Sequence, residues 1–239
     1  MKKAEKAERV EKVGRAEKGE RVEREGRAMD KTAIVAYYEE LLAQHGENYR
    51  ALDWNSSESQ KLRFQILKEL FIYGKKASGI SVLDVGCGFG DFYGFLKAEG
   101  LLTRHRISYF GYDLSPKLLE VARKKYREAK FELKDILEDR YLPKFDYVFS
   151  SGIFNIRVSE ISEHLEYVKE MLMRMYDLAN YGVGANFLSE GMLPTNTDQS
   201  SQYFFFKPEE LVSFCRYLCS RFVLRHDYHP GDFTLYLLK

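Results

Sequence analysis

Val82-Leu83-Asp84-Val85-Gly86-Cys87-Gly88-Phe89-Gly90 decides the fold of this 239-residue chain, together with Gly111-Tyr112-Asp113 downstream. The first stretch starts as an apolar run, reaches an acid, and continues as a loop in which every second residue is glycine. The residues after this loop have a helical pattern. This order predicts a strand, a tight turn and a helix whose first N–H groups face a ligand.

The loop glycines and the two acids each have an expected task. Gly86 permits a tight exit from the strand, Gly88 lets the backbone approach a ligand, and Gly90 lets the helix pack near the strand. Asp113 ends the next predicted strand, where it either accepts hydrogen bonds from both hydroxyls of a ribose or serves as a turn or capping acid. The Asp84 side chain is expected either to face a ligand amino group or to stabilise the turn itself.

Strands and helices alternate along most of the chain. Strands are predicted near residues 80–85, 107–112, 129–133, 145–150, 182–188, 220–226 and 232–238. Helices are predicted near residues 34–43, 58–73, 91–99, 116–128, 158–180 and 208–218. The alternation predicts an α/β fold of the Rossmann-like kind, a three-layer α/β/α sandwich around a seven-stranded, mostly parallel sheet. The last two strands are joined by a loop too short for a crossover helix, so the last strand is expected to be antiparallel.

The first 28 residues have a different composition from the rest. Residues 4–15 and 16–27 are two copies of a charged twelve-residue repeat, AEKAERVEKVGR and AEKGERVEREGR. With so few apolar residues this segment cannot bury a core, so we expect a helical or disordered extension. It is either a partner-binding or RNA-binding arm or a dispensable upstream region. The folded domain is expected over residues 29–239, with an N-terminal helical cap over residues 29–78.

Composition narrows the class of protein. The formal net charge of +1 argues against bulk attraction to nucleic acid or to an anionic membrane. Three cysteines do not make a disulfide framework, and Cys215 and Cys219 share one helical face as small buried hydrophobes. No metal site is expected, because further ligands at suitable spacing are lacking. No run approaches the ~20 apolar residues of a membrane span, so a cytoplasmic protein is expected.

The loop also resembles a known family. Leu83 to Gly90 is similar to the glycine motif of class I S-adenosylmethionine-dependent methyltransferases, in which an acid before the glycines and the order Gly-Cys-Gly are common. A dinucleotide fingerprint would read Gly-x-Gly-x-x-Gly, whereas this loop reads Gly-x-Gly-x-Gly followed by Asp91. The resemblance extends over about residues 58–239. It implies a methyltransferase of this family with S-adenosyl-L-methionine as its cofactor.

The resemblance assigns cofactor contacts to individual positions. Cys87 and the loop glycines would surround the methionine portion, and Asp113 would hold the ribose. Asp135 would meet the adenine amino group, although an ordinary loop acid is the alternative. Leu114 and Ile136 would enclose the adenine ring.

Two further segments enter through the same resemblance. Ser150 starts the segment that would lie beside the reactive methyl group. Residues 54–64 are similar to a helix that precedes the glycine motif in a bacterial and archaeal branch of the family. Arg63, in that helix, would reach the cofactor carboxylate or form a surface salt bridge.

The acceptor is left open, apart from its size. Motifs typical of base, glutamine, pyrimidine-carbon and metal-dependent catechol methylation are absent, so we expect a small molecule methylated at an oxygen or nitrogen atom. Asn155, His226 and His229 are candidate catalytic groups, although a rim histidine is also a common turn hydrogen-bonder. Tyr37 and Tyr38 either close over the acceptor or pack the first helix.

Two other functions remain open from the sequence. The same loop could serve a nicotinamide-dependent oxidoreductase on a Rossmann domain. Alternatively, the chain could be a non-catalytic, S-adenosylmethionine-binding regulatory protein that is recruited through its charged arm. Binding of NADH without binding of S-adenosylhomocysteine favours the first, and cofactor binding without turnover favours the second.

Overall fold

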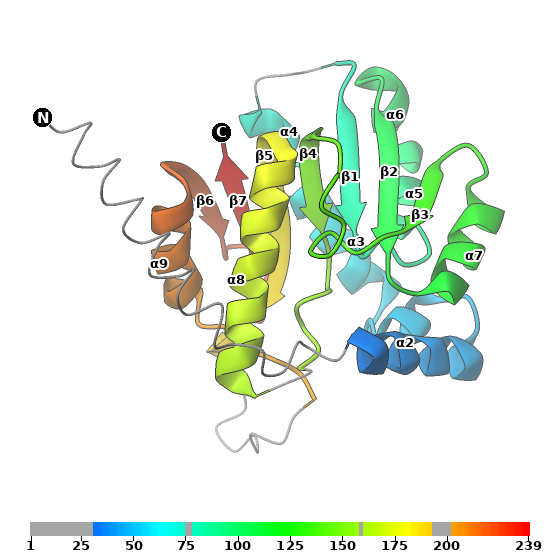
Figure 1. The fold of residues 1–239 in the computed structure, drawn as a ribbon, viewed down its shortest axis with the longest axis horizontal. Coiled ribbons are helices and arrows are strands. Elements are labelled where there is room, and N and C mark those ends of the chain that lie inside the picture. The colour runs from blue at the N-terminus through cyan, green and yellow to red at the C-terminus, as the bar shows by residue number, and fades with distance from the viewer. Residues whose placement is uncertain (1–30, 75–77, 158–159, 193–201) are drawn as a thin grey trace, which may run out of the picture. The chain divides into compact units, whose positions relative to one another are not determined.

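The centre of the protein is one seven-stranded sheet, ordered β3-β2-β1-β4-β5-β7-β6 (Figure 1). The computed structural model describes residues 31–74, 78–157, 160–192 and 202–239, so the prediction for residues 1–28 lies outside the described part. The strands are β1 (Ser81–Val85), β2 (Ser108–Asp113), β3 (Lys130–Leu133), β4 (Phe145–Ser150), β5 (Ala179–Leu188), β6 (Arg221–Arg225) and β7 (Asp232–Leu238).

Strand direction agrees with the prediction. The pairs β1–β2, β1–β4, β2–β3 and β4–β5 are parallel, whereas β7 runs antiparallel to both β5 and β6. The prediction of a mostly parallel sheet with an antiparallel last strand is therefore confirmed. In addition, β7 inserts between β5 and β6, an order that the short β6–β7 connection did not reveal.

Helices cover both faces of the sheet. They are α2 (Lys31–His45), α3 (Ser57–Leu67), α4 (Leu70–Tyr73), α5 (Asp91–Ala98), α6 (Leu101–Arg104), α7 (Pro116–Lys125), α8 (Ile161–Leu178) and α9 (Pro208–Leu218), with short 3-10 turns η1 (Tyr49–Leu52) and η2 (Glu190–Met192). Apolar residues of α8 and α9 belong to one buried cluster, and those of α3 to α7 belong mainly to a second cluster. Alternate residues of β4 separate them: Val148 joins the first cluster, and Tyr147 and Phe149 join the second. This is the predicted α/β/α sandwich.

Helix α7 begins with a capping serine followed by a proline. The Ser115 hydroxyl accepts a hydrogen bond from the Leu118 N–H at 3.2 Å, and Pro116 occupies the first turn. A side-chain cap satisfies a backbone donor that has no partner within the helix, and proline has no such donor to lose. The start of α7 is therefore fixed next to Asp113, directly after β2.

The structure differs from the predicted elements in the cap region. The helix predicted over residues 58–73 is interrupted at Lys68 and Glu69, which separate α3 from α4. Neither η1 nor α6 was predicted, because each contains only four residues and leaves little periodicity. Within the described residues, no helix combines the length and apolar character needed to cross a membrane.

The sheet order determines where a ligand can bind. The strand order reverses at β1, which has β2 on one side and β4 on the other. Val85, at the end of β1, is in register with Tyr112 of β2 and Ser150 of β4, so the carboxyl ends of the three strands lie at one edge. In open α/β sheets, ligands bind in the crevice outside such a reversal.

Candidate functional site

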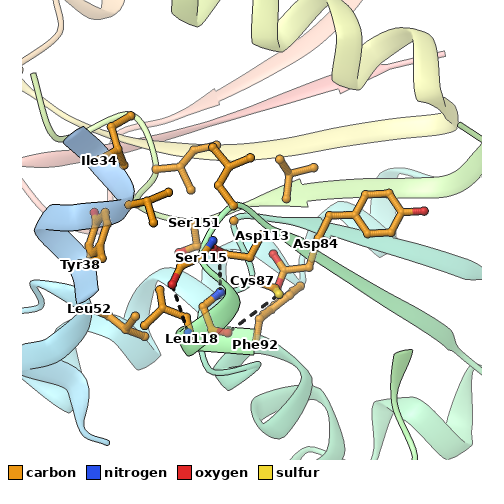
Figure 2. Close-up of a pocket in the computed structure, with 18 of the residues that line it drawn as sticks. Ile34, Tyr38, Leu52, Asp84, Cys87, Phe92, Asp113, Ser115, Leu118 and Ser151 are labelled. Carbon is orange, nitrogen blue, oxygen red and sulfur yellow. Dashed lines mark hydrogen bonds between the residues drawn. The ribbon is translucent and has the colours of Figure 1, made fainter. Parts of the chain in front are cut away.

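A cavity of about 1080 Å³, part of which is open to solvent, lies at that edge of the sheet. We call it the main cavity (Figure 2). Its floor contains the glycine loop and the ends of β1 and β2, and Ile34 and Tyr38 of α2 lie on the side opposite Asp84 and Cys87. The residues predicted for the cofactor that line it are Asp84, Gly86, Cys87, Gly88, Asp113, Leu114, Asp135 and Ile136.

The glycine loop has the backbone conformation that its sequence demands. Gly86, Gly88 and Gly90 all have positive φ, at 71°, 51° and 72°. Gly90 is the N-cap of α5, and a Cβ built there would lie 2.7 Å from the Phe131 ring. Gly90 itself does not line the main cavity; it lets α5 start against β3, and the cavity-lining Asp91 and Phe92 follow it. The first N–H groups of a helix have no partner within that helix.

Asp113 is held by the backbone on both of its oxygens. Oδ2 accepts the Gly88 N–H at 2.8 Å, and Oδ1 accepts the Ser115 N–H at 2.9 Å. Burial raises the pKa of this carboxyl, and the two backbone bonds oppose the shift. Each carboxylate oxygen can accept more than one bond, so acceptor capacity remains for a ligand diol. Asp113 thus ties the glycine loop to α7 and also borders the cavity.

Asp84 lies on the cavity floor and is 3% exposed. The buried Tyr109 hydroxyl of β2 donates a hydrogen bond to its Oδ2. Burial raises the pKa of Asp84 to about 7, and the bond from Tyr109 opposes that shift. A neighbouring positive charge would restore the ionised form, because an opposite charge favours it.

Asp135 is partly occupied by other groups. Its Oδ2 pairs with Lys31 Nζ at 2.5 Å, and its Oδ1 accepts the Leu137 N–H at 2.9 Å. Lys31 starts α2, so this ion pair fixes the beginning of that helix beside the cavity. Ile136 is buried, and Leu114 borders the cavity from the end of β2.

The remaining predicted residues lie away from the main cavity. Ser150 is buried, and its hydroxyl has no hydrogen-bond partner among the described residues. His226 accepts or donates only locally, at the Pro230 carbonyl, and His229 contacts Gly231 and Asp232. Both histidines are exposed and line neither cavity described here, which matches their alternative interpretation as turn hydrogen-bonders.

Arg63 neither lines the main cavity nor lies on the surface. Its guanidinium is 2.5 Å from Asp232, donates to Ser59 Oγ at 2.6 Å, and lies 4.7 Å from the Trp54 ring centre. The salt-bridge alternative therefore fits, but Arg63 of α3 and Asp232 at the start of β7 are both buried rather than on the surface. The sequence could not reveal a partner 169 positions away.

A second pocket adjoins the main cavity. It encloses about 670 Å³, part of which is open to solvent. It shares Tyr38, Leu52, Trp54 and Gly152 with the main cavity, and its other lining residues are Asp53, Asn55, Arg63, Asn155, Ile156, Leu188, Tyr203 and Phe205. Asn155 lines this pocket, where its Oδ1 accepts the Leu188 N–H at 3.3 Å. Of the candidates for a catalytic group, Asn155 alone borders a cavity described here.

Sequence reasoning missed several of these groups. Lys31 and Asp53 were not singled out, and Tyr38 was left between two roles. Trp54 was noted only as the start of a segment similar to one branch of the family. The signal in the sequence that could have pointed to Asp53 was its position next to the chain's sole tryptophan, Trp54.

The charge of the main cavity favours a cationic ligand. Asp84, Asp91, Asp113 and Asp135 line it, against Lys31 and Lys134 as its lysines. S-adenosylmethionine carries a sulfonium, an ammonium and one carboxylate, so its net charge complements this lining. A dinucleotide brings a diphosphate, which the ionised carboxylates among these groups would repel. The residues present therefore fit S-adenosylmethionine better than a nicotinamide cofactor.

Comparison with known proteins agrees with this fit. Residues 82–174 match a family model described as a methyltransferase domain. A Mycobacterium tuberculosis protein named "Putative methyltransferase Rv1506c" is 27% identical over 165 residues, which cover 68% of this chain and 95% of that protein.

Solved structures share the fold. Magnesium protoporphyrin IX methyltransferase of Synechocystis PCC 6803, with bound S-adenosylhomocysteine, superimposes with a TM-score of 0.60 at 16% identity, covering 88% of this chain and 100% of its own. The carbon methyltransferase CurJ gives a TM-score of 0.56 at 12% identity, covering 78% of this chain and 56% of its own. At such identities the likeness is one of fold, and one of these neighbours is a carbon methyltransferase.

Fold, cavity and comparisons agree with one another. The chain has the Rossmann-like fold, and residues 82–174 are similar to a methyltransferase domain, which supports an S-adenosylmethionine-dependent methyltransferase of class I. The Synechocystis enzyme was solved with S-adenosylhomocysteine and with S-adenosylmethionine bound, which supports S-adenosyl-L-methionine as the methyl donor here.

Proposed function

We propose that this methyltransferase modifies an oxygen or nitrogen atom of a small molecule that occupies the second pocket. The observation that carries the proposal is the common wall of the two spaces, formed by Tyr38, Leu52, Trp54 and Gly152. A molecule in the second pocket would lie next to a cofactor in the main cavity. A pocket of about 670 Å³ suits a ligand of small-molecule size.

The cofactor contacts form part of the proposal. Asp113 would accept hydrogen bonds from the ribose hydroxyls with its remaining lone pairs. Leu114 and Ile136 would enclose the adenine, with Asp135 near its amino group if Lys31 shares that carboxylate. Asp84 would face the ammonium group, and the glycine loop would surround the methionine portion.

Methyl transfer itself places modest demands on the protein. The donor carbon is already activated by the sulfonium, so alignment of the acceptor and exclusion of water can supply much of the rate. Aromatic faces such as Tyr38 and Trp54 also attract a cation. The proposed cytoplasmic location agrees with three cysteines that are all free and buried.

The first experiment measures cofactor binding by isothermal titration. We expect S-adenosylhomocysteine to bind and NADH not to bind. Asp113→Ala should weaken S-adenosylhomocysteine binding by about 1.5–3 kcal/mol, or about 10- to 150-fold, because a charge-assisted bond is lost. Asp177→Ala is the matched control, since Asp177 is exposed on α8 and should leave the affinity unchanged.

Two results would contradict the proposal at different points. Equal affinity of Asp113→Ala and wild type would remove the ribose role of Asp113. Tight binding of S-adenosylhomocysteine without its formation from S-adenosylmethionine, across a broad set of hydroxyl and amino compounds, would favour the regulatory alternative.

A further inference from the structure

Three segments that are distant in sequence meet at Asp53, in the wall of the second pocket. The Tyr37 hydroxyl of α2 donates to Asp53 Oδ2 at 3.0 Å, and the Tyr203 hydroxyl donates to Oδ1 at 3.0 Å. Gln202 Nε2 in turn donates to the Tyr37 hydroxyl at 3.0 Å. We call Asp53, Tyr37 and Tyr203 the Asp53 triad.

The backbone at Asp53 is also specialised. With φ 58° and ψ 35°, it lies in the left-handed region directly after η1, and its N–H donates to the Arg50 carbonyl. Among the described residues, Arg106 is the other non-glycine residue with positive φ. Aspartate tolerates this conformation better than most residues, although it still has a cost. The turn points the carboxylate toward the two tyrosines rather than toward solvent.

Asp53 carries a charge that no cation among the described residues pairs with. Arg63 of α3 lines the same pocket, but its guanidinium is engaged by Asp232 and Ser59. Burial raises the pKa of the Asp53 carboxyl, and the bonds from Tyr37 and Tyr203 oppose the shift. Each oxygen accepts one tyrosine bond, so each retains capacity for a second donor.

The rest of the second pocket is mostly aromatic and apolar. Tyr38, Trp54, Tyr203 and Phe205 contribute aromatic groups, and Leu52, Ile156 and Leu188 contribute aliphatic ones. Such walls suit a flat, apolar molecule. Trp54, next to Asp53 in sequence, also borders the main cavity, so the triad lies close to the wall shared with the cofactor.

We propose that Asp53 binds the hydroxyl group of a flat, apolar acceptor and receives its proton during methyl transfer. This inference rests on the proposed function and narrows it to an oxygen atom. The acceptor oxygen forms a bond to the methyl carbon, the carbon–sulfur bond breaks, and its electron pair stays on sulfur, which becomes a neutral thioether. The hydroxyl proton passes to a carboxylate oxygen of Asp53.

The acidity of the groups explains why a hydroxyl is favoured over an amine. A hydroxyl oxygen becomes strongly acidic as it is methylated, so even a carboxylate suffices as the base. A neutral amine keeps its proton as an ammonium ion after methylation and needs no base. Tyr37 and Tyr203 hold the carboxylate in place, and they are positioning residues.

The test uses a matched pair of probes with the full chain loaded with S-adenosylhomocysteine. 2-Naphthol donates a hydrogen bond, whereas 2-methoxynaphthalene has the same ring system and cannot donate. Wild type should bind 2-naphthol at least about tenfold more tightly, as expected for one bond to a charged group. Asp53→Asn should reduce that preference to less than about threefold, while the affinity for S-adenosylhomocysteine stays unchanged.

A second variant covers the case in which Asp53→Asn fails to fold. Tyr203→Phe removes one donor to the carboxylate, so the pKa of Asp53 should rise and the preference for 2-naphthol should disappear at a higher pH than in wild type. The titratable and charged groups around Asp53 are Tyr37 and Tyr38 of α2, Tyr203, and Arg63 of α3 across the pocket. None of them changes charge in the acidic range where a carboxyl titrates.

Three outcomes would overturn the inference. They are the absence of saturable 2-naphthol binding up to its solubility, equal affinity of the two probes for wild type, and an undiminished preference in Asp53→Asn. An unshifted pH midpoint in Tyr203→Phe would overturn it as well. Failure of the wild type to bind S-adenosylhomocysteine would instead reject the proposed function, so the two failures can be distinguished.

Discussion

The two spaces at the edge of the sheet are built in different ways. The main cavity takes most of its floor from Asp84 to Phe92 and from Tyr112 to Ser115, two short continuous segments. The second pocket draws its lining from α2, η1 and the residues directly after it, α3, the segment from Gly152 to Ile156, the end of β5, and Tyr203 with Phe205. A local motif can bind a ligand that a whole family shares, whereas the proposed acceptor pocket is built by side chains from scattered segments.

The first prediction concerns the buried acid on the floor of the main cavity. The pKa of Asp84 is about 7 in the folded protein, and about 3.9 is usual in an unfolded chain. Its contribution to stability is therefore complete below pH ~3.9 and is lost as the pH rises through about 7. Asp84→Asn cannot ionise, so its free energy of unfolding relative to wild type should increase by up to about 4 kcal/mol between pH ~4 and ~8. Urea denaturation across this range measures the difference.

The control for this prediction is Tyr109→Phe, which removes the donor to Asp84 but leaves the carboxyl group. Its stability should fall at least as steeply with pH as that of wild type. If the free energy of unfolding changed with pH in the same way for Asp84→Asn and wild type, ionisation of Asp84 would not affect stability.

The second prediction compares two glycines of nearly equal φ. Gly90 has φ 72° with the Phe131 ring 2.7 Å from a built Cβ, whereas Gly100 has φ 69° with nothing within 4 Å. Gly100→Ala should cost about 1 kcal/mol of unfolding free energy from backbone strain alone. Gly90→Ala should cost about 2–4 kcal/mol, because overpacking is added, and it should weaken S-adenosylhomocysteine binding by displacing the start of α5. Equal costs would mean that the close packing of α5 against β3 is not required.

The third prediction concerns α2, which borders both spaces. Lys31 pairs with Asp135, with side-chain exposures of 25% and 19%, and Glu39 pairs with the more exposed Lys117. Lys31→Met should lower the unfolding free energy by about 0.5–1 kcal/mol and speed hydrogen exchange at the start of α2. Lys117→Met, the matched control, should have a smaller effect. If the two variants exchange alike, α2 is held by its apolar contacts rather than by its ion pairs.

The fold was predictable because its signals are local or periodic. All seven strands were expected close to their observed bounds, and the helix expected from residue 116 begins at Pro116. The main cavity was partly predictable for the same reason, since one loop and the acid at the end of the next strand contribute to its floor. The break between α3 and α4 was not predictable, because Lys68 and Glu69 are ordinary helix formers.

The residues that line the second pocket could not be predicted from the sequence. The run from Tyr203 to Phe206 shows why: Phe204 and Phe206 are buried, whereas Tyr203 and Phe205 line the second pocket. Alternation in an extended segment sends neighbours to opposite sides, but only the packed fold shows which side faces a cavity. His226 and His229 were candidate catalytic groups in the sequence. In the structure both form hydrogen bonds within their own turn.

The sequence by itself determined the parallel sheet, the glycine loop and the acid that follows it, because steric rules and hydrophobic periodicity act over a few residues. Only the tertiary structure decided that Arg63 pairs with Asp232, that Lys31 reaches Asp135, and that Asp53 receives two tyrosine hydroxyls. Those partners lie far apart along the chain, and their contacts follow from how helices pack on the sheet. The sequence therefore indicates the methyl donor. The residues that line the second pocket, the proposed acceptor site, are known only from the folded structure.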